Sequence, residues 1–170
     1  MRVVSLTGVQ ACPIHRAAQE LVRSGSIEPH IELIHTEGSD PRWNMPYTPA
    51  IKVTGGALLF VSGVTAAPIY HSHPHVAAEF DHIPEDPAAQ TEMTMENLKL
   101  VLNQANGSLT SIVQLVRFIV DQDRNQDAIN AVMGRHLAEH RAASTTVEVV
   151  RLATDPRLVL ELQATAVVPE

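Results

Sequence analysis

The order in which helices and strands are expected along this chain constrains its fold more than any other feature. Apolar residues recur with a helical period after Asp86, a suitable N-cap residue that precedes Pro87, and the pattern ends at Asn106-Gly107. Runs of β-branched residues and a second helical pattern follow. The expected elements are strands over 50–54 and 57–62, this helix, a strand over 112–120, a helix over 123–137, and strands over 145–152 and 158–168.

This ββαβαββ order predicts an α+β fold in which each helix crosses over between strands of one mixed sheet. Because such crossovers are right-handed, both helices should cover the same face of the sheet. The residues expected to face the sheet are Ala89, Met93, Leu100 and Val101 in the first helix, and Ile129, Val132, Met133 and Leu137 in the second. The strand positions of the other face are mostly apolar or small, so we expect other subunits to cover it.

The first part of the chain divides into an extension and the start of the domain. Residues 1–29 are expected to form an N-terminal extension with a short strand over 2–7 and a helix over 13–23, which either packs on the rim of the oligomer or lengthens the sheet. Residues 30–170 should form one domain that begins with a strand over 31–36. Gly55-Gly56 tolerates positive φ and predicts a tight hairpin between strands 50–54 and 57–62.

Composition excludes several classes of function. The 170 residues carry a formal net charge of −7, and no Lys/Arg cluster is available to bind nucleic acid or an anionic membrane surface. The apolar stretches are shorter than the roughly 20 residues of a membrane-spanning helix. Cys12 is the only cysteine, so no intrachain disulfide can form, and a reducing cytoplasm is the expected location.

A long loop over 64–85 is rich in histidine. His71, His73 and His75 alternate, so an extended segment would point them to one side, and neutral imidazoles bind Zn, Cu or Ni. Alternate histidines are a weak pattern, however, and a solvated loop or one that caps a subunit is the more common interpretation. We therefore predict no metal and no other cofactor, and we expect the loop at the mouth of a cleft.

Several stretches, taken in chain order, resemble the RidA family, also called YjgF. They are Ile34-His35-Thr36-Glu37-Gly38, Pro46-Tyr47-Thr48-Pro49-Ala50, Leu59-Phe60-Val61-Ser62-Gly63, Glu85-Asp86-Pro87-Ala88-Ala89-Gln90, Glu96-Asn97-Leu98, Asn130, and 139–152 from Glu139-His140-Arg141 to Val150-Arg151-Leu152. The resemblance implies a chorismate-mutase-like fold and a homotrimer whose sheets form a central barrel, with ligand clefts between neighbouring subunits. It also implies hydrolysis of enamines and imines to ketones and ammonia, with a cleft arginine binding the substrate carboxylate.

Two positions depart from the pattern of the family. The cleft arginine of relatives falls at Ser144, and a glutamate that positions or activates water in active members falls at Gln163. An amide cannot accept a proton at neutral pH. Glu161 lies about 6–7 Å away on the same strand face, which is near but not equivalent. The cleft is therefore expected to be polar and nearly uncharged, unless Arg141 turns into it from its expected place on the surface.

Two functions remain open after these observations. One is a divergent deaminase for a small enamine, imine or unsaturated acid, and the other is a trimer that binds a small ligand without catalysis. The candidate catalytic residues are Ser144, Glu161 and Gln163, and the candidate ligand-binding residues are Tyr47, Ser62, Asn130, Thr145 and Thr146. The ordinary alternatives are a packed aromatic ring for Tyr47, strand hydroxyls for 144–146, and a solvent-facing or rim position for Glu161 and Gln163.

Overall fold

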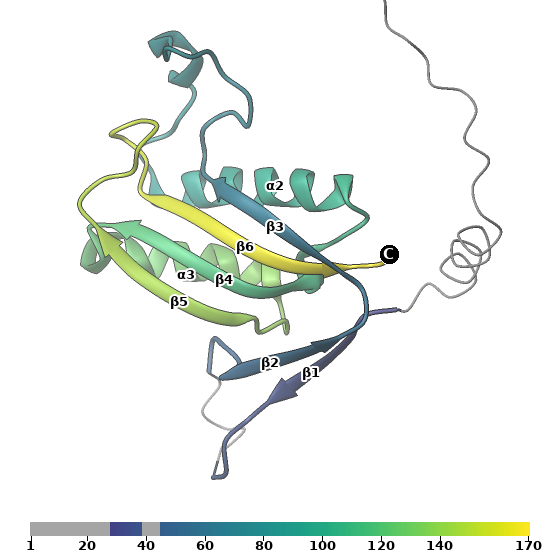
Figure 1. The fold of residues 1–170 in the computed structure, drawn as a ribbon. Coiled ribbons are helices and arrows are strands. Elements are labelled where there is room, and N and C mark those ends of the chain that lie inside the picture. Colours follow the sequence, from purple (N-terminus) through teal and green to yellow (C-terminus); the bar gives the residue numbers. More distant parts are fainter. Residues whose placement is uncertain (1–27, 39–44) are drawn as a thin grey trace, which may run out of the picture.

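Helices and strands alternate in the expected order in the computed structural model, which describes residues 28–38 and 45–170 (Figure 1). The elements are β1 (His30–Ile34), β2 (Ala50–Thr54), β3 (Ala57–Val64), α2 (Pro87–Gln104), β4 (Ile112–Val120), α3 (Gln122–Leu137), β5 (Ala143–Val149) and β6 (Leu160–Val168), with short 3₁₀ helices at Ala77–Phe80 and Leu109–Ser111. The predicted strand 2–7 and helix 13–23 lie outside the described residues. Among those residues, no helix is long and apolar enough to cross a membrane.

The main sheet is mixed and has the order β3-β6-β4-β5. Only the β4–β5 pair is parallel, because α3 crosses over between these two strands. Both helices lie against one face of the sheet, as predicted (Figure 1). The core between these layers includes Leu98 and Leu102 of α2, Ile129 of α3 and Leu162 of β6. The α+β prediction is therefore confirmed, and the single chain forms an open sheet.

The predicted hairpin between β2 and β3 is wrong. β2 pairs antiparallel with β1 in a separate two-stranded sheet, whereas β3 pairs with β6 in the main sheet. Gly55 and Gly56 both have a φ of 73°, as the glycine pair allows. A Cβ on Gly56 would lie 2.8 Å from side-chain carbons of Pro29 and Val167. The glycine pair therefore lets the chain pass closely between the two sheets, and the strands on its two sides have different partners.

The buried face of α2 also differs from the prediction, whereas that of α3 agrees with it. Leu100 is 56% exposed, and the buried residues of α2 are Gln90, Thr91, Thr94, Met95, Leu98 and Leu102. The hydroxyls of Thr91 and Thr94 donate to backbone carbonyls one turn earlier, which allows these polar side chains to lie inside. In α3, Ile129, Val132 and Met133 are buried, and Leu137 packs partly buried against the core.

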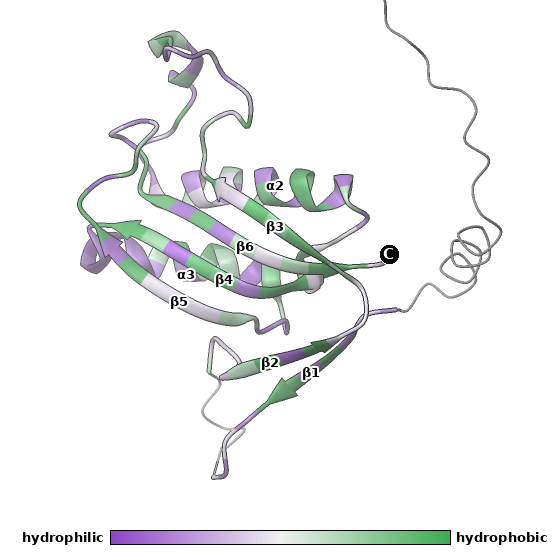
Figure 2. Cartoon of the chain, in the orientation of Figure 1, coloured by the Kyte–Doolittle hydropathy of each residue, from purple (hydrophilic) through white to green (hydrophobic). Residues whose placement is uncertain are grey.

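The second face of the sheet is not covered by any described element. Leu58 is 60% exposed and Phe60 is 76% exposed on this face of β3, where Figure 2 shows apolar residues along the strand. Val147 of β5 is also exposed there. Large apolar side chains gathered on one open sheet face are typical of a surface that is covered in an assembly.

Gln90 joins three segments that surround the start of α2. Its side chain is 1% exposed, and its amide nitrogen donates to the carbonyls of Pro84 and Arg157, each at 2.8 Å. Its amide oxygen accepts from the backbone N–H of Val159 at 3.0 Å. The loop before α2 and the connection between β5 and β6 are therefore held together by one buried amide.

Replacing this amide should destabilise the fold. Gln90→Leu leaves two buried carbonyls and one N–H without partners, and each such loss costs about 1–3 kcal/mol. We expect the free energy of unfolding to fall by about 3 kcal/mol, measured by urea denaturation at one fixed protein concentration. Gln104→Leu, at an exposed position of the same helix, is the matched control and should change it by less than about 0.5 kcal/mol. Equal effects of the two variants would contradict the role of the Gln90 hydrogen bonds.

Candidate functional site

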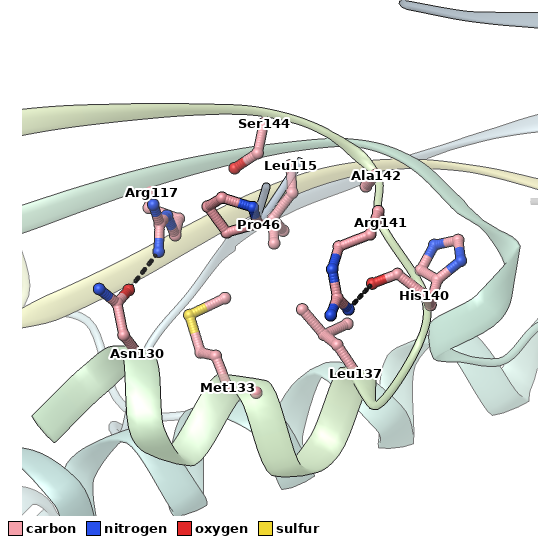
Figure 3. A pocket seen from close by; sticks show the side chains of 11 residues that line it. Pro46, Leu115, Arg117, Asn130, Met133, Leu137, His140, Arg141, Ala142 and Ser144 are labelled. Atoms are coloured by element: carbon pink, nitrogen blue, oxygen red, sulfur yellow. Dashed lines mark hydrogen bonds between the residues drawn. The ribbon is translucent and has the colours of Figure 1, made fainter. Parts of the chain in front are cut away.

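A pocket of about 200 Å³ lies between α3 and the strands β4 and β5 (Figure 3). Its lining comes from Leu115 and Arg117 of β4, Asn130, Met133, Gly134 and Leu137 of α3, the segment His140-Arg141-Ala142, Ser144 of β5, and Pro46. The polar groups of this lining come from separate elements, and they converge because α3 returns over the β4–β5 pair.

Strand register decides which side chains reach the pocket. In the parallel β4–β5 ladder, Leu115 is opposite Ser144 and Arg117 is opposite Thr146. Residues that are opposite or two apart along a strand share a face, so these four lie on the face that α3 covers. Ser144 and Asn130, both predicted site residues, are therefore brought together, and Thr146 lies beside them.

Arg117 is the principal charged group of the pocket. One of its terminal nitrogens donates to Asn130 Oδ1 at 2.7 Å and the other donates to Thr146 Oγ1 (Figure 3 shows the first bond). Among the described residues, its buried Nε has no hydrogen-bond partner. Burial lowers the pKa of Arg117 below its ordinary value, but a guanidinium keeps its charge in proteins. The pocket therefore holds a fixed cation, and two of its five N–H groups donate to described residues.

Arg141 also lines the pocket, but its guanidinium is engaged elsewhere. One of its terminal nitrogens donates to the carbonyl oxygens of Ala138 and His140, at the C-terminal end of α3. A cation at this end of a helix complements the exposed carbonyls. The backbone of Arg141 accepts a 2.6 Å hydrogen bond from the hydroxyl of Thr48, which places neighbouring Pro46 at the pocket. Through these hydrogen bonds Arg141 stabilises the segments that line this side of the pocket.

His140 has a defined tautomer in its neutral form. Its Nε2 lies 2.7 Å from the carbonyl oxygen of Ile112, so Nε2 carries the proton and donates. Nδ1 of the neutral ring then keeps its lone pair. His140 is therefore the one imidazole among the pocket-lining residues, and its lone pair is on Nδ1.

The cleft between subunits was expected to be nearly uncharged, but this pocket of the single chain is not. Two guanidiniums line it, and none of the lining residues is acidic. Arg117 was expected only as part of the strand over 112–120. A signal was present, because Arg117 is the only charged residue in Ile-Val-Gln-Leu-Val-Arg-Phe-Ile-Val, and a charge in the middle of an apolar strand needs a partner or a ligand.

The other predicted site residues lie on the opposite face of the sheet. Val116 of β4 is opposite Thr145 of β5 and also opposite Gln163 of β6, so these three form a row across the open face. Glu161 belongs to the next row, and a Cβ added to Gly63 would overlap its carboxylate. Ser62 is exposed at the end of β3 near these residues. Tyr47 is 38% exposed and is not among the lining residues.

The histidine-rich loop brings together the three residues that alternate in the sequence. Ligand atoms of His71, His73 and His75 lie within 4.8 Å of one another. No residue of this loop lines the pocket in the single chain.

The chain is similar over most of its length to a group of proteins with the same fold. Residues 38–168 match the family model described as Endoribonuclease L-PSP. A RutC family protein of Pyrococcus abyssi is 32% identical over 136 residues, which cover 79% of this chain and 95% of the relative. The 3-aminoacrylate deaminase RutC of Acinetobacter baylyi is 32% identical over 118 residues, which cover 69% of this chain and 84% of the relative.

Solved structures agree with these sequence relatives. The Rid-family protein YyfB of Yersinia pestis superposes with a TM-score of 0.64 at 26% identity, over 81% of this chain and 98% of that chain. The resemblance inferred from the sequence is thereby confirmed. Because one family model spans most of the chain and the sheet and helices match a solved member, the chain belongs to the endoribonuclease L-PSP family, also known as RidA or YjgF.

Proposed function

We propose that this protein hydrolyses a small enamine or imine carboxylate to the carbonyl acid and ammonia, and that Arg117 binds the carboxylate. The guanidinium of Arg117, which lines the pocket and keeps N–H groups beyond its two hydrogen bonds, is the observation that carries the proposal. A carboxylate oxygen is the acceptor that a guanidinium binds most strongly. One relative, the 3-aminoacrylate deaminase RutC of Acinetobacter baylyi, is named for a substrate of this class.

In this proposal the arginine that binds the carboxylate lies on β4 instead of on the neighbouring strand β5. The resemblance implies an arginine at the position of Ser144 on β5, and Arg117 extends from β4 on the same face, two residues further along. The small Ser144 side chain leaves room for the Arg117 guanidinium above β5, where it reaches Thr146. A volume of about 200 Å³ suits a ligand of a few carbon atoms.

The reaction requires a proton donor, water and a proton acceptor. An enamine first takes a proton on carbon and becomes an iminium ion. Water then adds to the iminium carbon, forming a C–O bond while the C=N π electrons become a lone pair on nitrogen, and a base takes a proton from the added water. Nitrogen takes up a proton, and the C–N bond breaks as the hydroxyl oxygen forms the C=O bond and gives up its proton, which releases ammonia and the carbonyl acid. We assign delivery of the protons to carbon and nitrogen to His140, the imidazole of the pocket.

We further propose that the site is completed by a second subunit of a homotrimer. Ser62, Thr145, Glu161 and Gln163 lie on the open face, away from the pocket of their own chain. The exposed Leu58 and Phe60 of that face favour coverage by another copy. A neighbouring subunit that packs on this face can bring the edge of its pocket next to Glu161. The Glu161 carboxylate then accepts the proton from water, which the amide of Gln163 cannot do.

Removing the cation should weaken substrate binding. Arg117→Met is expected to lower kcat/KM for freshly generated 3-aminoacrylate by about 30–100-fold, mainly through KM, because a charged hydrogen-bond pair contributes about 2–3 kcal/mol. Ammonia release is measured with a coupled glutamate dehydrogenase assay. Arg124→Met, at an exposed position of α3, is the control and should behave as the wild type. Unchanged kcat/KM in Arg117→Met would contradict the role of Arg117 in carboxylate binding.

Moving the cation back to β5 tests its position separately from its charge. Ser144→Arg added to Arg117→Met should recover at least part of the lost kcat/KM, because the new guanidinium extends over the same sheet face. Ser144→Arg alone places two cations side by side in one pocket and should lower thermal stability. If the double variant is no better than Arg117→Met for either 2-aminoacrylate or 3-aminoacrylate, the two positions are not interchangeable.

Mixing two inactive subunits tests whether neighbouring chains share the site. Glu161→Gln should reduce kcat by about 100-fold or more if this carboxylate accepts the proton. When Glu161→Gln and Arg117→Met chains are co-expressed, about a quarter of shared sites receive one intact half from each chain, so the rate should rise to about a quarter of wild type. If each site lies within one chain, every site keeps one defect and the mixture stays as inactive as its parents.

A binding protein without catalysis is the second candidate, favoured by the absence of a carboxylate from the pocket-lining residues. This alternative predicts that the stable carbonyl acids bind with Arg117-dependent affinity in calorimetry, while no enamine or imine releases ammonia faster than in buffer. Ammonia release above background would exclude it.

A further inference from the structure

The loop between β3 and α2 gathers three imidazoles outside the pocket. The ring centroids of His71, His73 and His75 are 4.8–4.9 Å apart in all three pairs. The rings are tilted or edge-on to one another, so they do not form a parallel stack. From the sequence, no metal was predicted here, because alternate histidines are a weak pattern and a solvated or subunit-capping loop is the more common interpretation. The folded loop brings the three rings together.

The orientation of His71 is fixed by its surroundings. Its Nδ1 lies 3.0 Å from the carbonyl oxygen of Pro68, which accepts, so Nδ1 carries the proton and Nε2 keeps the free lone pair. A backbone carbonyl bound to the second ring nitrogen is the usual support of a metal-ligating histidine. The ring also packs edge-on against Phe80, with centroids 5.2 Å apart.

The base of the loop is anchored to the rest of the fold. Phe80 is 2% exposed and belongs to a small hydrophobic cluster with Ile83 and Leu158. Its carbonyl oxygen accepts a 3.0 Å hydrogen bond from Arg157 in the connection between β5 and β6. His75 packs against the same ring, at 5.4 Å. Two of the three histidines, His71 and His75, therefore pack against a buried aromatic ring.

Negative charge lies beside the histidines. Glu79 accepts hydrogen bonds of 2.8 Å from both the backbone N–H and the hydroxyl of Ser72, which closes the loop between His71 and His73. These two bonds, and more weakly the charges of His71 and His75, lower the pKa of Glu79, so its carboxylate is ionised at neutral pH. The pKa of Asp155 is lowered chiefly by hydrogen bonds from Arg157, and His75 adds only a small effect. Nearby carboxylates offset the charge of a bound cation.

From these contacts we propose that His71, His73 and His75 form a binding site for one divalent transition-metal ion of the kind that prefers imidazole, with Zn²⁺ as its test ion. Three neutral nitrogen donors suit Zn²⁺, Cu²⁺ and Ni²⁺ and do not suit Mg²⁺ or Ca²⁺, which require oxygen ligands. Tetrahedral Zn–N bonds of about 2.0 Å require donor nitrogens about 3.3 Å apart. The donors lie within 4.8 Å, and the exposed rings of His73 and His75 can rotate to close the difference.

Such an ion would organise the loop and does not enter the proposed deaminase chemistry. Three protein ligands leave a fourth position for water. The loop joins β3, whose end carries Ser62 on the open sheet face, to the capped start of α2. Metal binding would therefore rigidify the segment that follows this face.

The test uses the full chain without an affinity tag, because a histidine tag would bind the same ions. After dialysis against a chelator, titration calorimetry with Zn²⁺ should give one site per chain, and Mg²⁺ should give none. His73→Ala and His75→Ala should each weaken Zn²⁺ binding by at least 10-fold. His82→Ala, an exposed histidine of the same loop, is the matched control and should leave the affinity unchanged.

Two further readouts separate loss of a ligand from loss of the fold. Circular dichroism of the metal-free variants should match that of the wild type, since His73 and His75 are exposed. X-ray absorption at the zinc edge should show three imidazole nitrogens in the wild type and two in His73→Ala. Fewer than half an equivalent of bound Zn²⁺, fewer than three imidazoles in the wild type, or an equal loss in His82→Ala would overturn the proposal.

Discussion

The alternation of side chains along β4 is the constraint on which the rest of the structure depends. β4 is the only strand of the main sheet that pairs with both a parallel and an antiparallel neighbour, and α3 packs on one of its faces. From this register, Leu115 and Arg117 face the helices, whereas Val116 and Phe118 face the open side. A slip of one residue would exchange the two sets and would place a guanidinium on the open face.

Much of the fold was predictable because its signals are local. The first long helix begins at Asp86, whose carboxylate accepts from the N–H of Ala89, and its end is followed by Asn106 with a positive φ. The strand predicted over 112–120 is observed as β4 with the same bounds. Capping residues and runs of β-branched residues act within a few positions of one another, so one sequence is enough to read them.

The parts that were not predictable depend on distant partners. The glycine pair at 55–56 is compatible with a hairpin, but β2 pairs with β1 and β3 pairs with β6, so the two strands do not pair with each other. Arg117 was missed because the sequence does not show which face of β4 is covered by α3, and this is settled only when β4 pairs with β5 and β6. In α2, the threonines are buried through hydrogen bonds that hydropathy does not represent.

The position of the cation on β4, an inner strand, has consequences that an arginine on the edge strand β5 would not have. Arg117 is held from two sides, by Asn130 of α3 and by Thr146 of β5, so its guanidinium plane is fixed before any ligand arrives. Pre-organisation of this kind reduces the entropy lost on binding. Each terminal nitrogen keeps a second N–H beyond these two bonds, so a carboxylate bound as proposed above can accept from the guanidinium while Asn130 and Thr146 keep holding it in place.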